Sequence, residues 1–142
     1  MKTMILALIA MTSLTVSAQS STCKLISKSV SYANGEAGTM TAITNDAYWT
    51  LVRSGDDYEL KNMEMQSLIE KTQNNSANEN QLILNQNFGK RFALNGYYGT
   101  NKFTLDLTTG DAVMTTHTVP HLIADINAPE AERTSTIILK CL

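Results

Sequence analysis

The 142-residue sequence has no cluster of basic residues and, beyond its N-terminus, no long apolar run. Binding to a nucleic-acid backbone needs clustered Lys and Arg, so the first absence argues against a nucleic-acid partner. No later stretch is long enough to cross about 30 Å of hydrocarbon, which argues against stable membrane insertion of the mature protein. Internal repeats and hinge-like linkers are absent as well. A single domain of ordinary globular composition fits these observations.

The first 18 residues have the pattern of a cleaved secretory signal peptide. Lys2 supplies a positive start, residues 4–11 form a short apolar run, and a Val-Ser-Ala triplet ends at Ala18. Because signal peptidase requires small or short residues at the first and third positions of such a triplet, we expect cleavage after Ala18. The sequence thus predicts a secreted or periplasmic domain of residues 19–142. Loss of Lys2 leaves ten Lys+Arg against thirteen Asp+Glu, a net charge of −3.

Two membrane-bound alternatives are weaker than cleavage. The apolar run at 4–11 is too short to span about 30 Å as an anchor. A lipidated Cys23 would need an aliphatic residue three positions earlier, and Ser20 stands there.

The two cysteines, Cys23 and Cys141, lie near the two ends of the expected domain. In oxidising compartments an even number of cysteines usually forms disulfides, and two cysteines allow one pairing. Redox-active pairs instead lie close in sequence, as in Cys-x-x-Cys. We therefore predict a structural Cys23–Cys141 disulfide. It requires the first and last strands to be neighbours, because the two Cα atoms must come within about 7 Å.

Short apolar runs separated by turn residues dominate the domain. Residues 103–107 alternate apolar and polar, and Gly110 lies in the polar break before 112–116, which is typical of a β-hairpin. Further strand-like runs are found at 24–32, 39–44, 48–53, 81–84, 91–96 and 136–141. The pattern predicts an all-β fold of roughly seven to nine strands, a small antiparallel barrel or sandwich. A disulfide between the terminal strands favours the barrel, because a barrel closes by pairing them.

Turn residues suggest how some of these runs pair. We expect 39–44 to pair with 48–53 across Asn45 and Asp46. We also expect 81–84 to pair with 91–96 across a turn at 87–90, with another turn at 95–99.

Two segments are ambiguous. Residues 58–71 combine good helix formers with apolar spacings that suit either a helix or a strand. We expect a strand there that passes into one short helix or an irregular end. Residues 72–80 have Ala77 as their one apolar residue, and we expect an exposed loop. Within it, Asn74-Asn75-Ser76 fits the acceptor pattern for N-glycosylation.

The two histidines, His117 and His121, are the candidates for a metal site. A spacing of four puts both on one face of a helix, but Pro120 argues against a helix here. On a strand they would lie about 13 Å apart, so only a bend at Pro120 would bring the imidazoles together. Such a site would take a further ligand from Asp106, Asp111 or Asp125. We expect two unrelated histidines and no cofactor.

Catalytic motifs are weak. No Gly-x-Ser-x-Gly elbow is present to activate a serine nucleophile. Asp56, Asp57 and Glu59 are clustered carboxylates of the type that glycosidases use, but they follow Gly55 in a predicted turn. Solvated turn acids are the better interpretation, and an enzyme is the less favoured class of function.

Two aromatic pairs, Tyr48-Trp49 and Tyr97-Tyr98, lie in or beside predicted strands. Neighbours in a strand point to opposite faces, so each pair should place one ring inside and one outside. Outward rings are frequent anchors for partners, and we take Tyr48, Tyr97 and Tyr98 as the candidate binding surface. Trp49 is the better core candidate.

These observations favour a secreted or periplasmic β-domain that binds another macromolecule, as an inhibitor or an envelope-accessory protein. The expectation rests on a stabilised small scaffold, exposed loops and aromatics, and the lack of a catalytic or cofactor motif. The first alternative is a carrier of a small apolar ligand in a barrel interior, which methionines would line adaptably. The second is a metal-dependent hydrolase that uses His117 and His121.

Overall fold

A computed structural model describes residues 17–32, 38, 40–92, 95–122 and 132–142, with the backbone alone for 90–92, 95–97 and 120–122. These residues form nine strands and no helix. The strands are β1 (Gln19–Tyr32), β2 (Thr41–Ala42), β3 (Tyr48–Ser54), β4 (Asp57–Lys61), β5 (Ser67–Gln73), β6 (Gln81–Phe92), β7 (Asn95–Asp106), β8 (Asp111–Leu122) and β9 (Arg133–Cys141). No helix in this part of the chain has the length and apolarity to span a bilayer.

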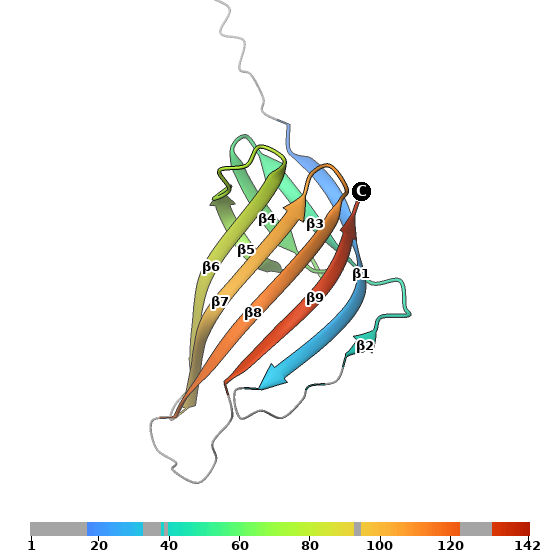
Figure 1. Ribbon diagram of the computed structural model, residues 1–142. Helices are drawn as coiled ribbons and strands as arrows, with labels where there is room; N and C mark the ends of the chain where they lie inside the picture. The colour runs from blue at the N-terminus through green and yellow to red at the C-terminus, as the bar shows by residue number, and fades with distance from the viewer. Residues whose placement is uncertain (1–16, 33–37, 39, 93–94, 123–131) are drawn as a thin grey trace, which may run out of the picture.

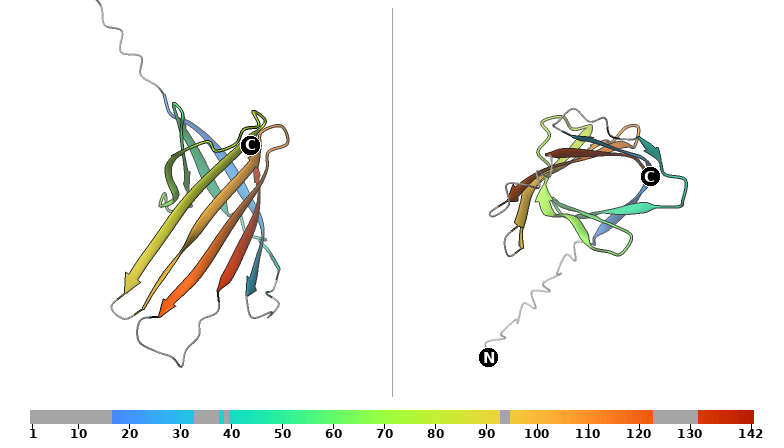
Figure 2. Two further views of the ribbon diagram at one scale, coloured as in Figure 1. Left: turned by 60° about the vertical axis from the view of Figure 1, so that its left-hand side comes forward. Right: turned by 90° about the horizontal axis from the view of Figure 1, so that it is seen from below.

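All nine strands belong to one antiparallel sheet, which curls into a nearly closed barrel (Figures 1 and 2). The order is β5-β4-β3-β1-β9-β8-β7-β6, and the short β2 pairs with β1 outside this path. If β2 is left aside, each strand except β6 pairs with the strand that precedes it in the chain. The last strand, β9, also pairs with the first, β1. The predicted all-β fold is therefore confirmed as a barrel, and the sandwich alternative is excluded.

The closing pair, β1 and β9, carries the disulfide. Cys23 lies opposite Cys141 in the ladder, and the two are bonded across 118 residues of sequence. Both are buried in the core. The predicted bond and the predicted neighbouring terminal strands are confirmed. A disulfide of this kind indicates a non-cytoplasmic, oxidising compartment.

The strands of the barrel wall differ in length. Strands β3, β4 and β5 have 7, 5 and 7 residues, whereas β6, β7 and β8 have 12 each and β1 has 14. β3 pairs with β1 only from Gln19 to Lys24. The short strands therefore line only the half of the barrel near the disulfide, and the long strands continue beyond them (Figure 1). The other half has an open side.

The hydrophobic core fills the half that has a complete wall. Phe103 is its largest fully buried side chain. Its buried members among the described side chains are Cys23, Leu25, Leu51, Leu60, Ile69, Leu82, Leu84, Phe103, Leu105, Ala112, Met114, Leu139 and Cys141. They come from every strand of the barrel path, as expected when alternate residues of each strand face inward.

A β-bulge in β1 reverses which residues face inward. Leu25 lies opposite Leu139, but the register shifts between Leu25 and Ser27, and Lys28 then lies opposite Ile137. Since Leu139 and Ile137 are two apart on β9, they share the inner face. The extra residue in β1 therefore brings Lys28 to the same face as Leu25.

The predicted pairing of 39–44 with 48–53 is wrong. β2 and β3 both pair with β1, β2 through Thr41 opposite Lys28 and β3 through Tyr48 opposite Lys24. The physical reason is the length of β1, whose edge continues past the end of β3 and is covered by β2. Residues 43–47 connect β2 to β3 along the edge of β1, where Ile43 N donates to Ile26 O at 2.8 Å.

The strand expected at the start of 58–71 is confirmed as β4, but the short helix expected as one of its two continuations is wrong, because the segment is a hairpin of β4 and β5. The side chain of Asn62 holds its turn: Oδ1 accepts hydrogen bonds from Glu64 N at 3.0 Å and Gln66 N at 2.9 Å. Met65 has a left-handed φ of 61°. A methionine at a position that favours glycine concealed the turn from sequence patterns.

The turns predicted at 87–90 and 95–99 are wrong as well. β6 is continuous from Gln81 to Phe92, and β7 from Asn95 to Asp106. Gly99, inside β7, marks a close contact instead of a turn. A Cβ at Gly99 would clash with the carbonyl oxygen of His117 and lie 2.9 Å from Cζ of Phe88. The hairpin predicted from 103–107 and 112–116 is confirmed as part of β7 and β8.

The seam between β5 and β6 is held largely by side chains. Glu70 N donates to Gln86 Oε1 at 2.8 Å. Inside the barrel, Asn101 Nδ2 donates to Leu68 O at 3.0 Å, and Asn101 Oδ1 accepts from Thr116 Oγ1 at 2.8 Å. One amide thus ties β5 to β7 and β8 across the gap in the backbone ladder.

The exposed polar segment predicted at 72–80 begins inside β5 and continues as a hydrogen-bonded loop. Asn74 Oδ1 accepts from Ser76 N and from Ile83 N, both at 2.9 Å, and Asn74 Nδ2 donates to Gln81 O at 3.1 Å. Asn74 is therefore part of the connection between β5 and β6.

We expect loss of the disulfide to weaken the fold strongly. A Cys23→Ala/Cys141→Ala variant should have a free energy of unfolding about 2–5 kcal/mol below that of the oxidised wild type, because the bond constrains a long loop in the unfolded chain. Urea denaturation measures this. Reductant should destabilise the wild type similarly and leave the variant unaffected. A variant within about 0.5 kcal/mol of the wild type would contradict the prediction.

Met65→Gly is expected to stabilise the protein by about 0.5–1 kcal/mol, since glycine adopts a left-handed φ without steric cost. Met63→Gly is a matched control in the same turn. Met63 and Met65 are 52% and 59% exposed, and among described non-glycine residues φ is positive only at Met65. The control should destabilise by about 0.5–1 kcal/mol through the entropy of the unfolded chain. Equal effects of the two substitutions in thermal unfolding would show that the turn is unstrained.

Asn101→Asp should open the seam. The new carboxylate keeps an acceptor for Thr116 but faces the carbonyl of Leu68 with an oxygen, so we expect a loss of about 1–3 kcal/mol. Hydrogen exchange should accelerate at the amides of β5. Thr116→Val is the control, because it removes one hydrogen bond of Asn101 and leaves the bond to Leu68. Equal exchange in β5 of both variants would refute the role of Asn101 at the seam.

Candidate functional site: a cavity in the open half of the barrel

The open half of the barrel contains a cavity of about 480 Å³, within the usual range of roughly 300–1,000 Å³ for small-molecule sites. Its lining comes from seven strands, β1, β3 and β5 to β9. It begins where the packed core ends, at the core residue Met114, which also lines the cavity. The fold thus fills one half of its interior and leaves the other half accessible.

On the wall formed by β1, β9 and β8, the strand register shows which lining residues lie side by side at each depth of the cavity. Ile137 lies between Lys28 and Met114 at the deepest level, and Ser135 lies between Val30 and Thr116 at the next. Toward the open end, Arg133 lies between Tyr32 and Thr118. This wall therefore presents two cations and three hydroxyl-bearing Ser and Thr side chains to the cavity, above an apolar floor.

The facing wall is mainly apolar. It presents Leu68 of β5 and Phe88 of β6, with Asn101 of β7 as its polar residue, and Trp49 of β3, the neighbour of β1, adds a third apolar side chain. Trp49 and Leu68 also pack against the core. The ring of Phe88 occupies the space beside Gly99 where another residue would carry a side chain. Gly99 thus allows an aromatic ring to lie against the backbone of β7.

The electrostatics of the cavity differ from those of the whole chain. The chain has a formal net charge of −2, yet the described lining contains Lys28 and Arg133 and no carboxylate. Ion pairs among the described residues lie elsewhere, namely Lys24–Asp46, Lys61–Glu59, His117–Glu132 and Lys140–Asp111. Neither cavity cation forms an ion pair with a described residue. The cavity is therefore locally positive.

Displaced carboxyl pKa values belong to side chains outside the cavity lining. Hydrogen bonds from the hydroxyl and backbone N–H of Thr108 lower the pKa of Asp106. The ammonium of Lys140 lowers the pKa of Asp111, and the hydroxyl of Ser67 lowers that of Glu59. These carboxylates stabilise turns and strand pairs, so their lowered pKa values reflect contacts within the fold and not a functional site.

The histidines do not share a site in the described structure. β8 stays extended past Pro120, and its ladder with β7 continues through Pro120 opposite Tyr97 and His121 opposite Gly96. The two histidine Cα atoms are thus separated by four strand residues, about 13 Å. His117 pairs with Glu132, and the side chain of His121 lies outside the described residues. No group of three potential metal ligands occurs among the described side chains.

The predicted aromatic surface is divided. Tyr48 is 45% exposed while Trp49 is half-buried and lines the cavity, and Tyr98 is 53% exposed. The side chain of Tyr97 lies outside the described residues. β3 and β7 are four strands apart in a path of eight, so they form opposite walls. Tyr48 and Tyr98 therefore cannot form one continuous patch.

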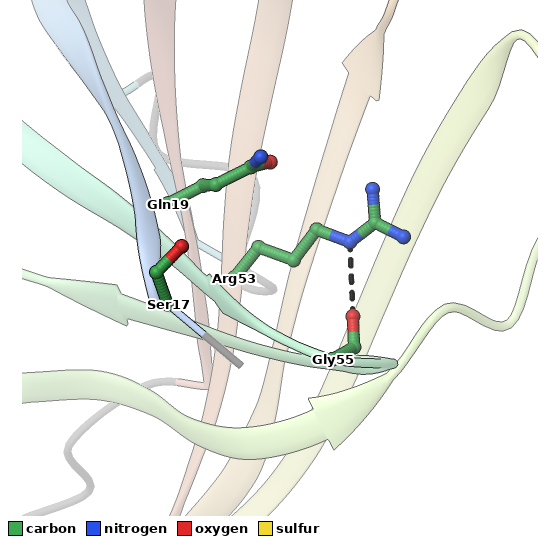
Figure 3. Close-up of a pocket in the computed structure, with 4 residues that line it drawn as sticks. All are labelled: Ser17, Gln19, Arg53 and Gly55. Atoms are coloured by element: carbon green, nitrogen blue, oxygen red, sulfur yellow. Dashed lines mark hydrogen bonds between the residues drawn. The ribbon is translucent and has the colours of Figure 1, made fainter. Parts of the chain in front are cut away.

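A second, smaller hollow of about 250 Å³ lies at the other end of the barrel, lined by Ser17, Gln19, Arg53 and Gly55 (Figure 3). Arg53 is engaged within the fold. Its Nε donates to Gly55 O at 2.9 Å, and its guanidinium lies 5.6 Å from the ring centroid of Tyr58. The hollow is below the usual size of a ligand site, so the larger cavity is the stronger candidate.

Comparisons with protein-family models, with curated proteins and with solved structures found no match to this chain. The functional argument therefore depends on the cavity and its residues.

Proposed function

We propose that the protein binds a small amphipathic molecule in the open half of the barrel. The observation that carries the proposal is the two-sided cavity of about 480 Å³. Its apolar wall offers contact area to a hydrocarbon or an aromatic ring, and its polar wall offers hydrogen-bond donors. Sites for small molecules combine these two elements, with the polar groups fixing the orientation of the ligand.

This proposal refines the alternative of an apolar-ligand carrier that the sequence suggests. A purely apolar molecule would displace water from Lys28, Arg133 and the hydroxyls of Thr118 and Ser135 without offering them a partner, although the Thr116 hydroxyl would keep its bond to Asn101. Buried polar groups without hydrogen bonds cost about 1–3 kcal/mol each. A molecule with one polar end avoids that cost, and we therefore favour an amphipathic ligand.

The compartment that we propose is the periplasm or the extracellular space. The predicted signal peptide and the disulfide support it. Binding of another macromolecule stays a prediction, and the separation of Tyr48 from Tyr98 weakens the surface on which it was based.

Trp49 provides a direct test, because it is the single tryptophan of the chain and lines the cavity. We expect its emission to change saturably, with about one equivalent bound, when the oxidised protein is titrated with dodecyl amphiphiles below their micellar concentrations. Native mass spectrometry of the protein purified from its source would identify a co-purified ligand.

The control is a variant with a filled cavity. Ser135→Phe places a ring among the lining side chains and should abolish the response of Trp49, and Thr118→Phe is a second variant of the same type. Thermal unfolding would check that each variant folds. An unchanged titration in a folded, filled variant, or no response of the wild type to any probe, would refute the proposal.

A further inference from the structure

We propose that the ligand carries an anionic head group, which Lys28 and Arg133 bind together, and an apolar body that lies against Trp49, Leu68 and Phe88. This inference rests on the proposed function and specifies its ligand class. The chemistry is that of an organic anion with a hydrocarbon or aromatic portion, such as a long-chain carboxylate or phosphate monoester.

The two cations are on adjacent strands and on the same face. Lys28 is opposite Ile137, and Arg133 is four residues from Ile137 along β9, about 13 Å in an extended strand. The pair Val30–Ser135 lies between them. Both cations have long, flexible side chains, so a group placed above Ser135 is within reach of the ammonium, the guanidinium and the hydroxyl. Guanidinium and ammonium groups together suit a carboxylate or a phosphate.

The bulge in β1 is independent support for a role of Lys28. With a regular register, Lys28 would point away from the interior, since it is three residues beyond the inward-facing Leu25. The shift between Leu25 and Ser27 turns it inward. β-Bulges often redirect a side chain next to a functional site. A cation directed into a barrel has no packing advantage over an apolar residue, so its placement suits recognition.

The charge inside the cavity has no described counter-charge. No carboxylate is found among the described lining residues, and the described ion pairs join other side chains. Lys28 and Arg133 are both exposed to solvent through the open side. An anion can therefore reach them from solution, and its charge would supply the missing partner.

The apolar wall determines the orientation. Trp49, Leu68 and Phe88 come from β3, β5 and β6, whereas the cations come from β1 and β9. In the barrel path β5 and β6 lie across the cavity from β1 and β9, whereas β3 is the neighbour of β1. A ligand with its head group at β1 and β9 would thus extend its apolar body across the floor at Met114 toward Phe88.

The experiment compares four probes with a common dodecyl chain through the emission of Trp49: dodecanoate, dodecyl phosphate, dodecan-1-ol and dodecyltrimethylammonium. For the wild type we expect at least one anion to bind about tenfold or more tightly than the alcohol, and the cation to bind most weakly. The more tightly bound anion identifies the head group. Higher ionic strength should weaken the anions and leave the alcohol unaffected, because salt screens charge interactions.

The matched variants separate cavity charge from total charge. Lys28→Gln/Arg133→Gln should lose about tenfold or more in anion affinity and keep the affinity for the alcohol. Lys24→Gln/Lys102→Gln removes two exposed charges that are not part of the cavity lining, and it should bind anions within about twofold of the wild type. Thermal unfolding would verify that both double variants are folded.

The outcomes distinguish this inference from the function on which it rests. If the alcohol binds as tightly as the anions, or if both double variants lose anion affinity equally, anion recognition by Lys28 and Arg133 is refuted while ligand binding stands. If none of the four probes changes the emission of Trp49 in the folded wild type, the proposed function itself is refuted.

Discussion

The pairing of β1 with β9 is the constraint on which the rest of the structure depends. It closes the sheet, and the Cys23–Cys141 bond holds it covalently at the packed end. Because β1 has β9 on one side and both β3 and β2 on the other, its length determines where the remaining wall can form. A barrel avoids exposed edges only where every strand has two neighbours. β3 ends before β1 does, and the cavity lies in the half that this difference leaves open.

The bulge in β1 separates inward-facing core residues from inward-facing residues of the cavity. Before it, β1 contributes Cys23 and Leu25 to the core, and after it the inward positions are Lys28, Val30 and Tyr32. One inserted residue is enough for this change, since side chains alternate between the faces of a strand. Without the shift, the odd-numbered residues would face inward along the whole of β1, and neither Lys28 nor Tyr32 would line the cavity.

Local patterns predicted what depends on neighbours in sequence, and pairing over long distances escaped them except at the disulfide between β1 and β9. The β7–β8 hairpin was predictable because Gly110 separates two alternating runs, and the disulfide because two cysteines allow one pairing. The partner of 39–44 depends instead on the length of β1, and the cavity combines residues of seven strands. Nothing local marks Lys28 as inward-facing, since recognising it requires the register of β1 against β9.

The open wall and the interior cations are linked by the cost of burying charge. If β3, β4 and β5 were as long as β6, β7 and β8, they would enclose the second half and remove Lys28 and Arg133 from water. An unpaired charge inside a protein costs several kcal/mol, which a small domain with a total stability of about 5–15 kcal/mol cannot easily offset. The short strands let water solvate both cations in the free protein. The same opening would admit the proposed ligand, whose anionic group would replace that water, so one difference in strand length both preserves the fold and provides the proposed site.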